Sequence, residues 1–169
     1  MDTMQTMEVD IAPDRSLGDI EELYREVAPG LWRAIYAYAG GQRDVADDAV
    51  AEAFTRLLEA PSHIRNPKAW LYRVAFRAAS AELKAEARHP GGHERRQHQA
   101  DPADLHAVLE AVRSLPPNQR AAIVLHYRLD LSVRQIADAL GISSATVRVH
   151  LHRGRNRLRD LLGQETSDD

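Results

Sequence analysis

The segment that most restricts the fold of this chain lies at residues 131–162 and reads LSVRQIADALGISSATVRVHLHRGRNRLRDLL. Ser132 followed by Gln135 has the capping-box spacing that begins a helix. Gly141 suits the left-handed position that ends a helix with a tight turn, and Ser143 can cap the helix that follows. Two short helices joined by a turn that contains glycine form a helix-turn-helix unit.

Apolar spacing divides this unit into a buried side and an exposed side. Ile136, Ala137 and Leu140 are expected to face the interior from the first helix, and Val147 and Leu151 from the second. The opposite side of the second helix is polar and basic, and carries Ser144, Ala145, Arg148, His152, Arg153, Arg155, Arg157 and Arg159. A helical hairpin with a solvated arginine-rich face is the alternative, but the caps, the glycine and the spacing together favour a DNA reader.

The exposed side has the chemistry that the major groove of double-stranded DNA requires. Small residues at the helix N-terminus allow the backbone to approach the DNA, and Arg148 can donate two hydrogen bonds to guanine O6 and N7. Hydroxyl groups and the positive end of the helix dipole bind phosphate. The arginines that follow add an attraction that salt weakens.

Helical periodicity also runs through the earlier part of the chain. Apolar residues recur at spacings of three and four over residues 17–35 and 43–59, and a third long helix is expected over residues 67–88. Pro29 and Gly30 are expected to kink or divide the first of these helices. Val, Ile, Tyr and Phe are sparse beside Ala, Leu, Arg and Glu, and this composition favours an all-α fold.

The helical segments are expected to form two small domains joined by a flexible linker. Residues 89–104, HPGGHERRQHQADPAD, contain proline and glycine and lack an apolar period, which is typical of a linker. The domains are expected at residues 17–88 and 105–162, with disordered tails at 1–16 and 163–169. The three linker histidines lack a compact ligand spacing, so a solvated linker is favoured over a metal site.

Charge is distributed unevenly behind the net value of −3. Residues 1–62 carry 13 acidic and five basic side chains, residues 65–100 carry three and eight, and residues 113–162 carry three and nine. Two basic blocks indicate two contacts with a polyanion. The acidic start indicates either a different partner or a solvated face.

Several classes of protein are excluded by composition. The chain has no cysteine, which excludes a disulfide framework, a thiolate zinc site and a cysteine nucleophile. It has no apolar run of about 18 residues, which a membrane-spanning helix needs. The first residues are acidic and lack the apolar run of a signal peptide, so a cytoplasmic location is expected.

A second basic surface is expected on the helix at residues 67–88. One stripe along this helix carries Arg73, Arg77, Ser80, Lys84 and Arg88. Three aromatic residues near its start, Trp70, Tyr72 and Phe76, follow His63 and Arg65 in the preceding loop. Aromatic rings beside cations suit unpaired bases, through stacking and phosphate pairing. The commoner alternative, favoured on this helix alone, is that Trp70 and Phe76 belong to the core.

Both halves together resemble the extracytoplasmic-function (group 4) sigma factors, which are two-domain specificity subunits of bacterial RNA polymerase. DVADDAVAEAFTRLLEA followed by NPKAWLYRVA is similar to sigma region 2. LPPNQRAAIVLHYRLDLSVRQIADALGISSATVRVHLHRGRNRLRDLL is similar to sigma region 4. The similarity covers residues 17–162. Both regions in this order across a short linker are more specific than either alone.

The resemblance implies three sets of contacts. The helix at residues 47–58 docks on the clamp coiled coil of the polymerase β′ subunit, through Asp47, Asp48, Glu52 and Arg56. The promoter −10 element, with a base flipped from the non-template strand, is held by His63, Arg65, Asn66, Lys68, Trp70, Arg73, Phe76, Arg77 and Lys84. The −35 element is read as duplex by Arg120, Ser143, Ser144, Ala145, Thr146, Arg148, Val149, His152, Arg153 and Arg155.

The resemblance also implies the partners. They are the β and β′ subunits of core RNA polymerase, promoter DNA and an anti-sigma factor, and the free protein is expected to be a monomer. No catalytic residue, metal or cofactor is implied, and no membrane insertion.

Four residues depart from the pattern of the family. Ala51 stands where a glutamine is usual, which removes one expected polymerase contact. Arg77 and Ala81 stand where asparagine and aspartate are common, so the −10 surface is more basic. Val149 replaces a small polar residue and can contact a thymine methyl group. We therefore expect an unusual −10 preference with an ordinary docking mode.

Two other classes of function fit part of the sequence. A DNA-binding regulator that acts alone as a dimer leaves the acidic helix at residues 47–59 without a role. A recombinase or nuclease needs a nucleophile or a carboxylate metal cluster. Asp47, Asp48 and Glu52 lie on one helix side, but neither a second carboxylate set nor a phosphate-binding glycine loop accompanies them.

Overall fold

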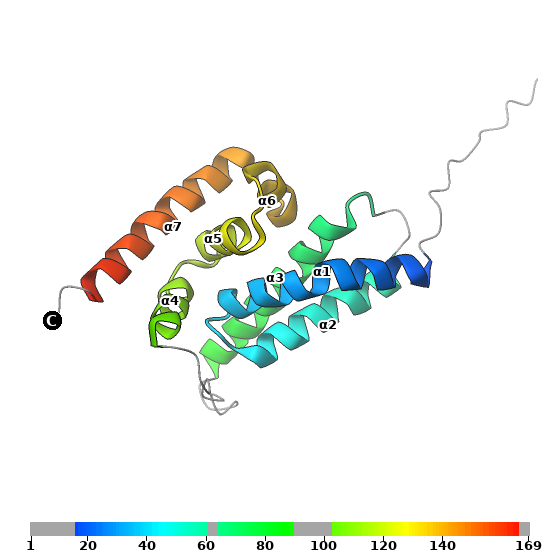
Figure 1. The fold of residues 1–169 in the computed structure, drawn as a ribbon, viewed down its shortest axis with the longest axis horizontal. Coiled ribbons are helices and arrows are strands. Elements are labelled where there is room, and N and C mark those ends of the chain that lie inside the picture. The colour runs from blue at the N-terminus through cyan, green and yellow to red at the C-terminus, as the bar shows by residue number, and fades with distance from the viewer. Residues whose placement is uncertain (1–15, 61–63, 90–102, 166–169) are drawn as a thin grey trace, which may run out of the picture.

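A computed structural model describes residues 16–60, 64–89 and 103–165 of the chain. These residues form seven helices and no strand, which confirms the all-α prediction (Figure 1). The predicted tail at residues 1–16 lies outside the described residues except for its last residue. Most of the predicted linker also lies outside them.

The first half of the chain folds as three long helices, α1 (Leu17–Tyr38), α2 (Arg43–Glu59) and α3 (Pro67–Arg88). In Figure 1, α1 and α2 lie side by side and α3 crosses them. Pro29 lies inside α1, so the predicted division of this helix does not occur. The helix continues because Leu31, which follows the proline by two positions, is fully buried in the core.

The second half contains α4 (Ala103–Arg113), α5 (Pro117–Leu129), α6 (Val133–Leu140) and α7 (Ser144–Glu165). Helix α4 begins two positions before the expected domain start, and α7 continues three residues beyond the expected domain end. Helix α5 contacts both α7 and α1 and therefore lies between them (Figure 1).

One apolar core cluster contains residues from all seven helices. Leu31 and Ile35 of α1, Leu125 of α5 and Ile136 of α6 belong to it, and each is 0% exposed. Helix α1 contacts α4 and α5, and α3 contacts α6. The two halves of the chain therefore pack against each other, which the prediction of two separately linked domains did not include.

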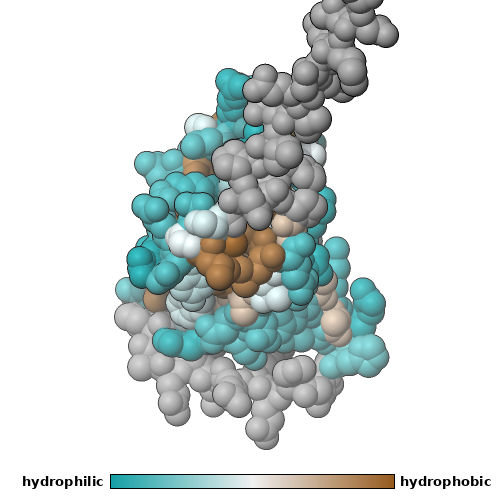
Figure 2. Space-filling model, turned by 90° about the vertical axis from the view of Figure 1, so that its right-hand side faces the viewer, coloured by the Kyte–Doolittle hydropathy of each residue, from teal (hydrophilic) through white to brown (hydrophobic). Residues whose placement is uncertain are grey.

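An apolar patch lies at the end of the molecule where α1 begins and α2 ends, on the face that Figure 2 shows. Leu17 is 78% exposed and Leu58 is 55% exposed. Leu58 lies in the last turn of α2, beside the buried Leu57, which is 1% exposed. No helix in the described part of the chain is long and apolar enough to cross a membrane.

Candidate nucleic-acid interface

The helix-turn-helix consists of α6, a tight turn and α7. The capping box of Ser132 and Gln135 is present at the start of α6, with both reciprocal hydrogen bonds. Gly141 ends α6 in the left-handed conformation, with φ 69° and ψ 36°. The hydroxyl oxygen of Ser143 accepts a hydrogen bond of 3.1 Å from the backbone nitrogen of Thr146 and so caps α7. The structure thus confirms the predicted motif and each of its three predicted capping residues, Ser132, Gly141 and Ser143.

The outer side of α7 is exposed because its inner side is buried. Val147 is 0% and Leu151 3% exposed. Most of the predicted −35 contacts lie on the outer side or at the start of the helix, exposed or half-buried: Ser143, Ser144, Ala145, Thr146, Arg148, Val149, His152, Arg153 and Arg155. Figure 1 shows α7 on the outside of the molecule, with its length free to approach a duplex.

A close approach between α7 and α5 holds the reading helix in place. A Cβ atom at Gly154 would lie 2.7 Å from Cγ1 of Ile123, which is closer than such atoms pack. Gly154 therefore lets the two helices meet without a side chain between them. Gly154 is a functional residue that the sequence pattern indicates only weakly, since a glycine inside a helical pattern commonly marks close packing.

His150 faces inward from the same helix. Its Nδ1 atom is buried without a hydrogen-bond partner. Burial, and secondarily the charge of Arg153, lowers the pKa of His150 below its ordinary value. The surroundings of His150 therefore favour its neutral form, whereas His152 lies on the exposed side.

Arg120, predicted to contact the −35 element, lies elsewhere. Its Nη2 donates a hydrogen bond of 3.0 Å to the carbonyl oxygen of Leu115, and its Nη1 donates one of 3.3 Å to that of Tyr38. The guanidinium lies 4.9 Å from the centre of the Tyr38 ring, and burial lowers its pKa. Arg120 thus faces the first half of the chain in this structure, and its contact with the −35 element stays a prediction.

The start of α3 holds the first of the predicted −10 residues. The side-chain oxygen of Asn66 accepts a hydrogen bond of 3.1 Å from the backbone nitrogen of Ala69 and caps the helix. Lys68 forms an ion pair with Glu26 of α1, Arg65 is exposed, and Trp70 is half-buried against the core. His63 lies outside the described residues.

Phe76 is a core residue. It is 4% exposed, and its ring lies 5.1 Å from the ring of Tyr38 in an edge arrangement. The structure thus places Phe76 in the core, as the commoner alternative expected, and its contact with the −10 element stays a prediction. The neighbouring Tyr72 is half-buried, and burial raises the pKa of its hydroxyl.

Arg73, another predicted −10 residue, is half-buried and binds the second half of the chain. Its Nε donates a hydrogen bond of 3.4 Å to the carbonyl oxygen of Ala139, and its Nη2 donates to that of Asp138. Arg77 and Lys84, the other two residues of the stripe that were predicted to contact the −10 element, are exposed.

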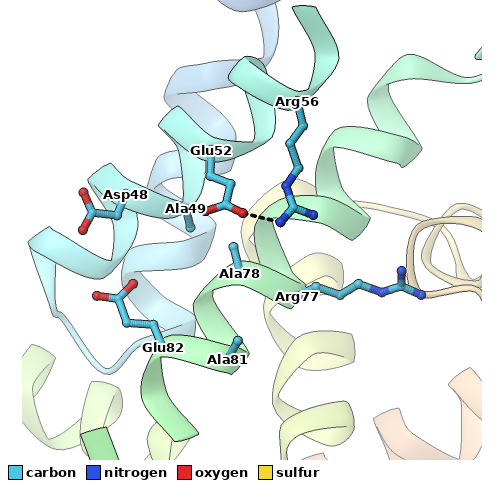
Figure 3. A pocket seen from close by; sticks show the side chains of 8 residues that line it. All are labelled: Asp48, Ala49, Glu52, Arg56, Arg77, Ala78, Ala81 and Glu82. Atoms are coloured by element: carbon cyan, nitrogen blue, oxygen red, sulfur yellow. Dashed lines mark ion pairs between the residues drawn. The ribbon is translucent and has the colours of Figure 1, made fainter. Parts of the chain in front are cut away.

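A shallow hollow of about 370 Å³ lies between α2 and α3. It is lined by Asp48, Ala49, Glu52, Arg56, Arg77, Ala78, Ala81 and Glu82. Figure 3 shows the carboxylates of Asp48 and Glu82 on one side of the hollow, while Arg77 points away from them. Residues predicted for polymerase docking and for −10 binding thus meet at one hollow, and Ala81 contributes to its width.

The exposed side of α2 carries the residues predicted to dock on the polymerase. Glu52 and Arg56 form an ion pair of 2.5 Å. Asp47 accepts a hydrogen bond of 2.7 Å from Nε1 of Trp32. Among the described residues, no three histidine or acidic side chains gather as a metal site would require.

Comparisons with known proteins give separate matches for the first and second halves of the chain. The chain matches the family described as sigma-70 region 2 over residues 19–89 and sigma-70 region 4 over residues 105–158. It is 31% identical over 166 residues to the ECF RNA polymerase sigma factor SigE of Mycolicibacterium smegmatis, covering 88% of this chain and 63% of that protein. It is 32% identical over 138 residues to the RNA polymerase sigma-E factor of Streptomyces antibioticus, covering 82% of this chain and 70% of that protein.

The probable ECF RNA polymerase sigma factor SigI of Mycobacterium tuberculosis is 32% identical over 156 residues, which cover 76% of this chain and 53% of that protein. The chain thus spans less than two thirds of the length of SigE and SigI. The chain belongs to the extracytoplasmic-function sigma factors.

Two solved structures share the fold. The sigma factor RpoE of Bartonella quintana, solved in complex with the anti-sigma factor NepR, gives a TM-score of 0.68 at 23% identity, over 87% of this chain and 98% of that one. CnrH, solved in complex with the cytosolic domain of CnrY, gives a TM-score of 0.69 at 22% identity, over 91% of this chain and 92% of that one.

Proposed function

We propose that this protein binds core RNA polymerase and directs it to promoters, as a specificity factor that catalyses no reaction itself. The observation that carries the proposal is the basic outer side of α7, held by a complete helix-turn-helix in a chain that also contains region 2. A regulator acting alone has no use for the exposed acidic side of α2. Transcription takes place beside the chromosome, so we assign the protein to the cytoplasm.

The −35 element is the duplex that α7 reads. Arg148 contacts guanine, Val149 contacts a thymine methyl group, and Ser143 and Thr146 bind phosphate at the helix start. Ser144 and Ala145 let the backbone approach the groove. His152, Arg153 and Arg155 follow the backbone of the DNA, where their contribution falls with salt.

The −10 element is held by the start and the exposed stripe of α3. The contacts are His63, Arg65, Asn66, Lys68, Trp70, Arg73, Arg77 and Lys84. The exposure of Arg77 supports the expectation of an unusual −10 preference, because a cation replaces a neutral side chain there. A promoter selection that recovers the family's usual −10 sequence, unchanged in Arg77→Ala, contradicts this expectation.

Core polymerase docks on α2 through Asp47, Asp48, Glu52 and Arg56, and the exposed Leu58 extends this surface. Large exposed apolar residues commonly mark protein contacts. An anti-sigma factor is a further partner in this proposal. RpoE was solved with the anti-sigma factor NepR, and CnrH with the cytosolic domain of CnrY, and both structures support it. The free protein is a monomer in this proposal.

Run-off transcription with purified core polymerase tests the proposal. We expect promoter-specific transcripts when the protein is added, and none with core polymerase alone. Asp48→Arg should reduce transcription without reducing binding to the −35 duplex. Asp104→Arg, at an exposed acidic residue of α4, is the matched control and should behave as the parent. Absence of any specific transcript from candidate promoters of the source genome would overturn the proposal.

A further inference from the structure

A side-chain hydrogen bond joins Trp32 of α1 to Asp47 of α2, two helices that lie side by side (Figure 1). The indole Nε1 of Trp32 donates to Oδ1 of Asp47 at 2.7 Å. An indole nitrogen is a donor only, and a carboxylate accepts. Hydrogen bonds to a charged acceptor are shorter and stronger than those between neutral groups. The bond therefore orients the Asp47 carboxylate at the edge of α2 that faces α1.

The Trp32 ring is packed between neighbours. The ring of Tyr36, one turn further along α1, stacks on it with the centroids 5.2 Å apart and the planes 9° apart. The guanidinium of Arg43, the first residue of α2, lies 6.0 Å from the centroid of each ring. Stacked rings and a cation over a ring are both attractive arrangements. The donor to Asp47 thus belongs to a half-buried, packed side chain.

Asp47 lies at one edge of the exposed side of α2. Asp47 and Arg56 are nine positions apart, which places them on about opposite sides of a helix with 3.6 residues per turn. Arg56 lines the hollow beside α3 and pairs with Glu52. The proposed docking surface is therefore bordered by two oriented side chains, Asp47 beside α1 and Arg56 beside α3.

The carboxylate of Asp47 is open to a partner over a small residue. Ala51 follows Asp47 by four positions, and residues with this spacing are neighbours on a helix surface. Both residues are exposed. Trp32 binds one carboxylate oxygen, Oδ1, and a carboxylate can accept at both of its oxygens. A long cationic side chain can therefore pass over Ala51 and donate to Asp47.

We propose that Trp32 is a positioning residue for polymerase docking, which holds Asp47 so that its carboxylate accepts a hydrogen bond from an arginine or lysine of the polymerase. This inference rests on the proposed function, in which Asp47 is a docking contact. A side chain that is already ordered loses less conformational entropy on binding than one that the partner must order. Trp32 acts through Asp47 and not through a contact of its own.

Trp32→Phe tests this role, because it removes the donor and keeps an aromatic ring beside Tyr36. We expect the dissociation constant for core polymerase to rise about fivefold, since Asp47 must then be ordered on binding. The chain has no cysteine, so Asp104→Cys, at an exposed position of α4, carries a single fluorophore in the parent and in every variant. Anisotropy titration with core polymerase measures the affinity.

A double-mutant cycle distinguishes positioning from a merely structural role. Asp47→Ala should weaken binding by itself. Trp32→Phe should then add no further loss in that background, because no carboxylate remains to be oriented. A merely structural role of Trp32 predicts that the two losses multiply. Multiplied losses therefore overturn the inference, as does a Trp32→Phe variant that binds as tightly as the parent.

The charge of the partner is tested at Asp47 itself. Asp47→Asn keeps an amide oxygen that can accept from Trp32 and removes the negative charge. A cationic partner predicts weaker binding and a smaller dependence of the affinity on salt, since salt screens the attraction between charges. A salt dependence equal to that of the parent overturns the assignment of a cationic partner.

The controls separate this inference from the proposed function. Tyr24→Phe, at a 51% exposed residue of α1, also removes one polar group from an aromatic ring and should bind core polymerase as the parent does. Trp32→Phe should still bind −35 duplex normally, which shows that it is folded. If the labelled parent does not bind core polymerase, the proposed function fails. If the parent binds and Asp47→Ala weakens binding but Trp32→Phe does not, only the positioning role fails.

Discussion

Arginine side chains occupy three kinds of environment in this chain, which differ in exposure and in hydrogen-bond partners. Arg148 is exposed on the outer side of α7, where a DNA base can reach it. Arg56 forms an ion pair with Glu52 on the surface of α2. Arg73 and Arg120 are half-buried and donate to backbone carbonyls. Helical spacing predicts the first two environments, while the third depends on residues far away in the chain.

Replacing Arg148 should relax the base preference at one position of the −35 element. A guanidinium that donates two bonds to guanine contributes about 1–3 kcal/mol of discrimination. We expect Arg148→Ala to lose about that much affinity for the preferred duplex only. Arg157→Ala, an exposed arginine on the same helix, should weaken all duplexes alike and reduce the dependence on salt. Anisotropy titrations on duplexes with single base changes distinguish the two; equal weakening on all of them by Arg148→Ala contradicts the assignment.

Half-buried His150 should make stability depend on pH. Its pKa is lower in the folded protein than its ordinary value of 6.5, so the unfolded chain binds a proton first as the pH falls. The contribution of neutral His150 to the free energy of unfolding is therefore complete above pH 6.5. It is lost as the pH falls below that value. Between about pH 7.5 and about pH 5.5, we expect the parent to lose more free energy of unfolding than His150→Gln, which has no group that titrates at this position. Urea unfolding at both pH values measures it, and a constant difference contradicts the expectation.

At the scale of elements, the helices could be predicted because their signals are local. Ser132, Gln135 and Gly141 each act within a few residues, and the structure places all three as expected. The surroundings of Phe76 and Arg120 could not be predicted in this way, because they depend on Tyr38 of α1, which contacts both. A stripe of residues on a helix shows which side chains share a face, but not what covers that face.

Helix α7 should tolerate alanine at one of its glycines and not at the other. A Cβ atom at Gly154 would meet Ile123 at 2.7 Å, whereas one at Gly163 would meet nothing within 4 Å. Overpacking should make Gly154→Ala less stable by about 1–2 kcal/mol, even though alanine favours the helix. Gly163→Ala should gain up to about 1 kcal/mol. Thermal unfolding of both variants checks the pair, and a stabilised Gly154→Ala would show that Ile123 gives way.

At the scale of the molecule, the packing of the two halves could not be read from the sequence. The residues that join them, Gly30, Arg73, Arg120 and Leu129, lie in four separate places along the chain. Arg73, Arg120 and Leu129 lie within the segments similar to sigma regions 2 and 4, but neither segment shows by its pattern that these residues contact the other half. A proline- and glycine-containing linker is compatible with joined or separated domains. Contacts of this kind need the tertiary structure.

The continuous core predicts how the free protein unfolds. Because one cluster contains residues of all seven helices, we expect a single thermal transition with equal calorimetric and van't Hoff enthalpies. Leu129→Asp, which places a charge against Gly30, should divide it into two transitions. Differential scanning calorimetry measures this, and two transitions in the parent protein would show that the halves unfold independently.

The acceptors of Arg73 and Arg120 are backbone carbonyls, and this shapes how the protein can change over evolutionary time. Every amino acid supplies a carbonyl, so substitutions at Tyr38, Asp138 or Ala139 leave those acceptors in place. Loss of the hydrogen bonds requires a change at one of the two arginines. The residues around these acceptors can therefore change while both contacts are inherited, and a single codon change at either arginine removes one of them.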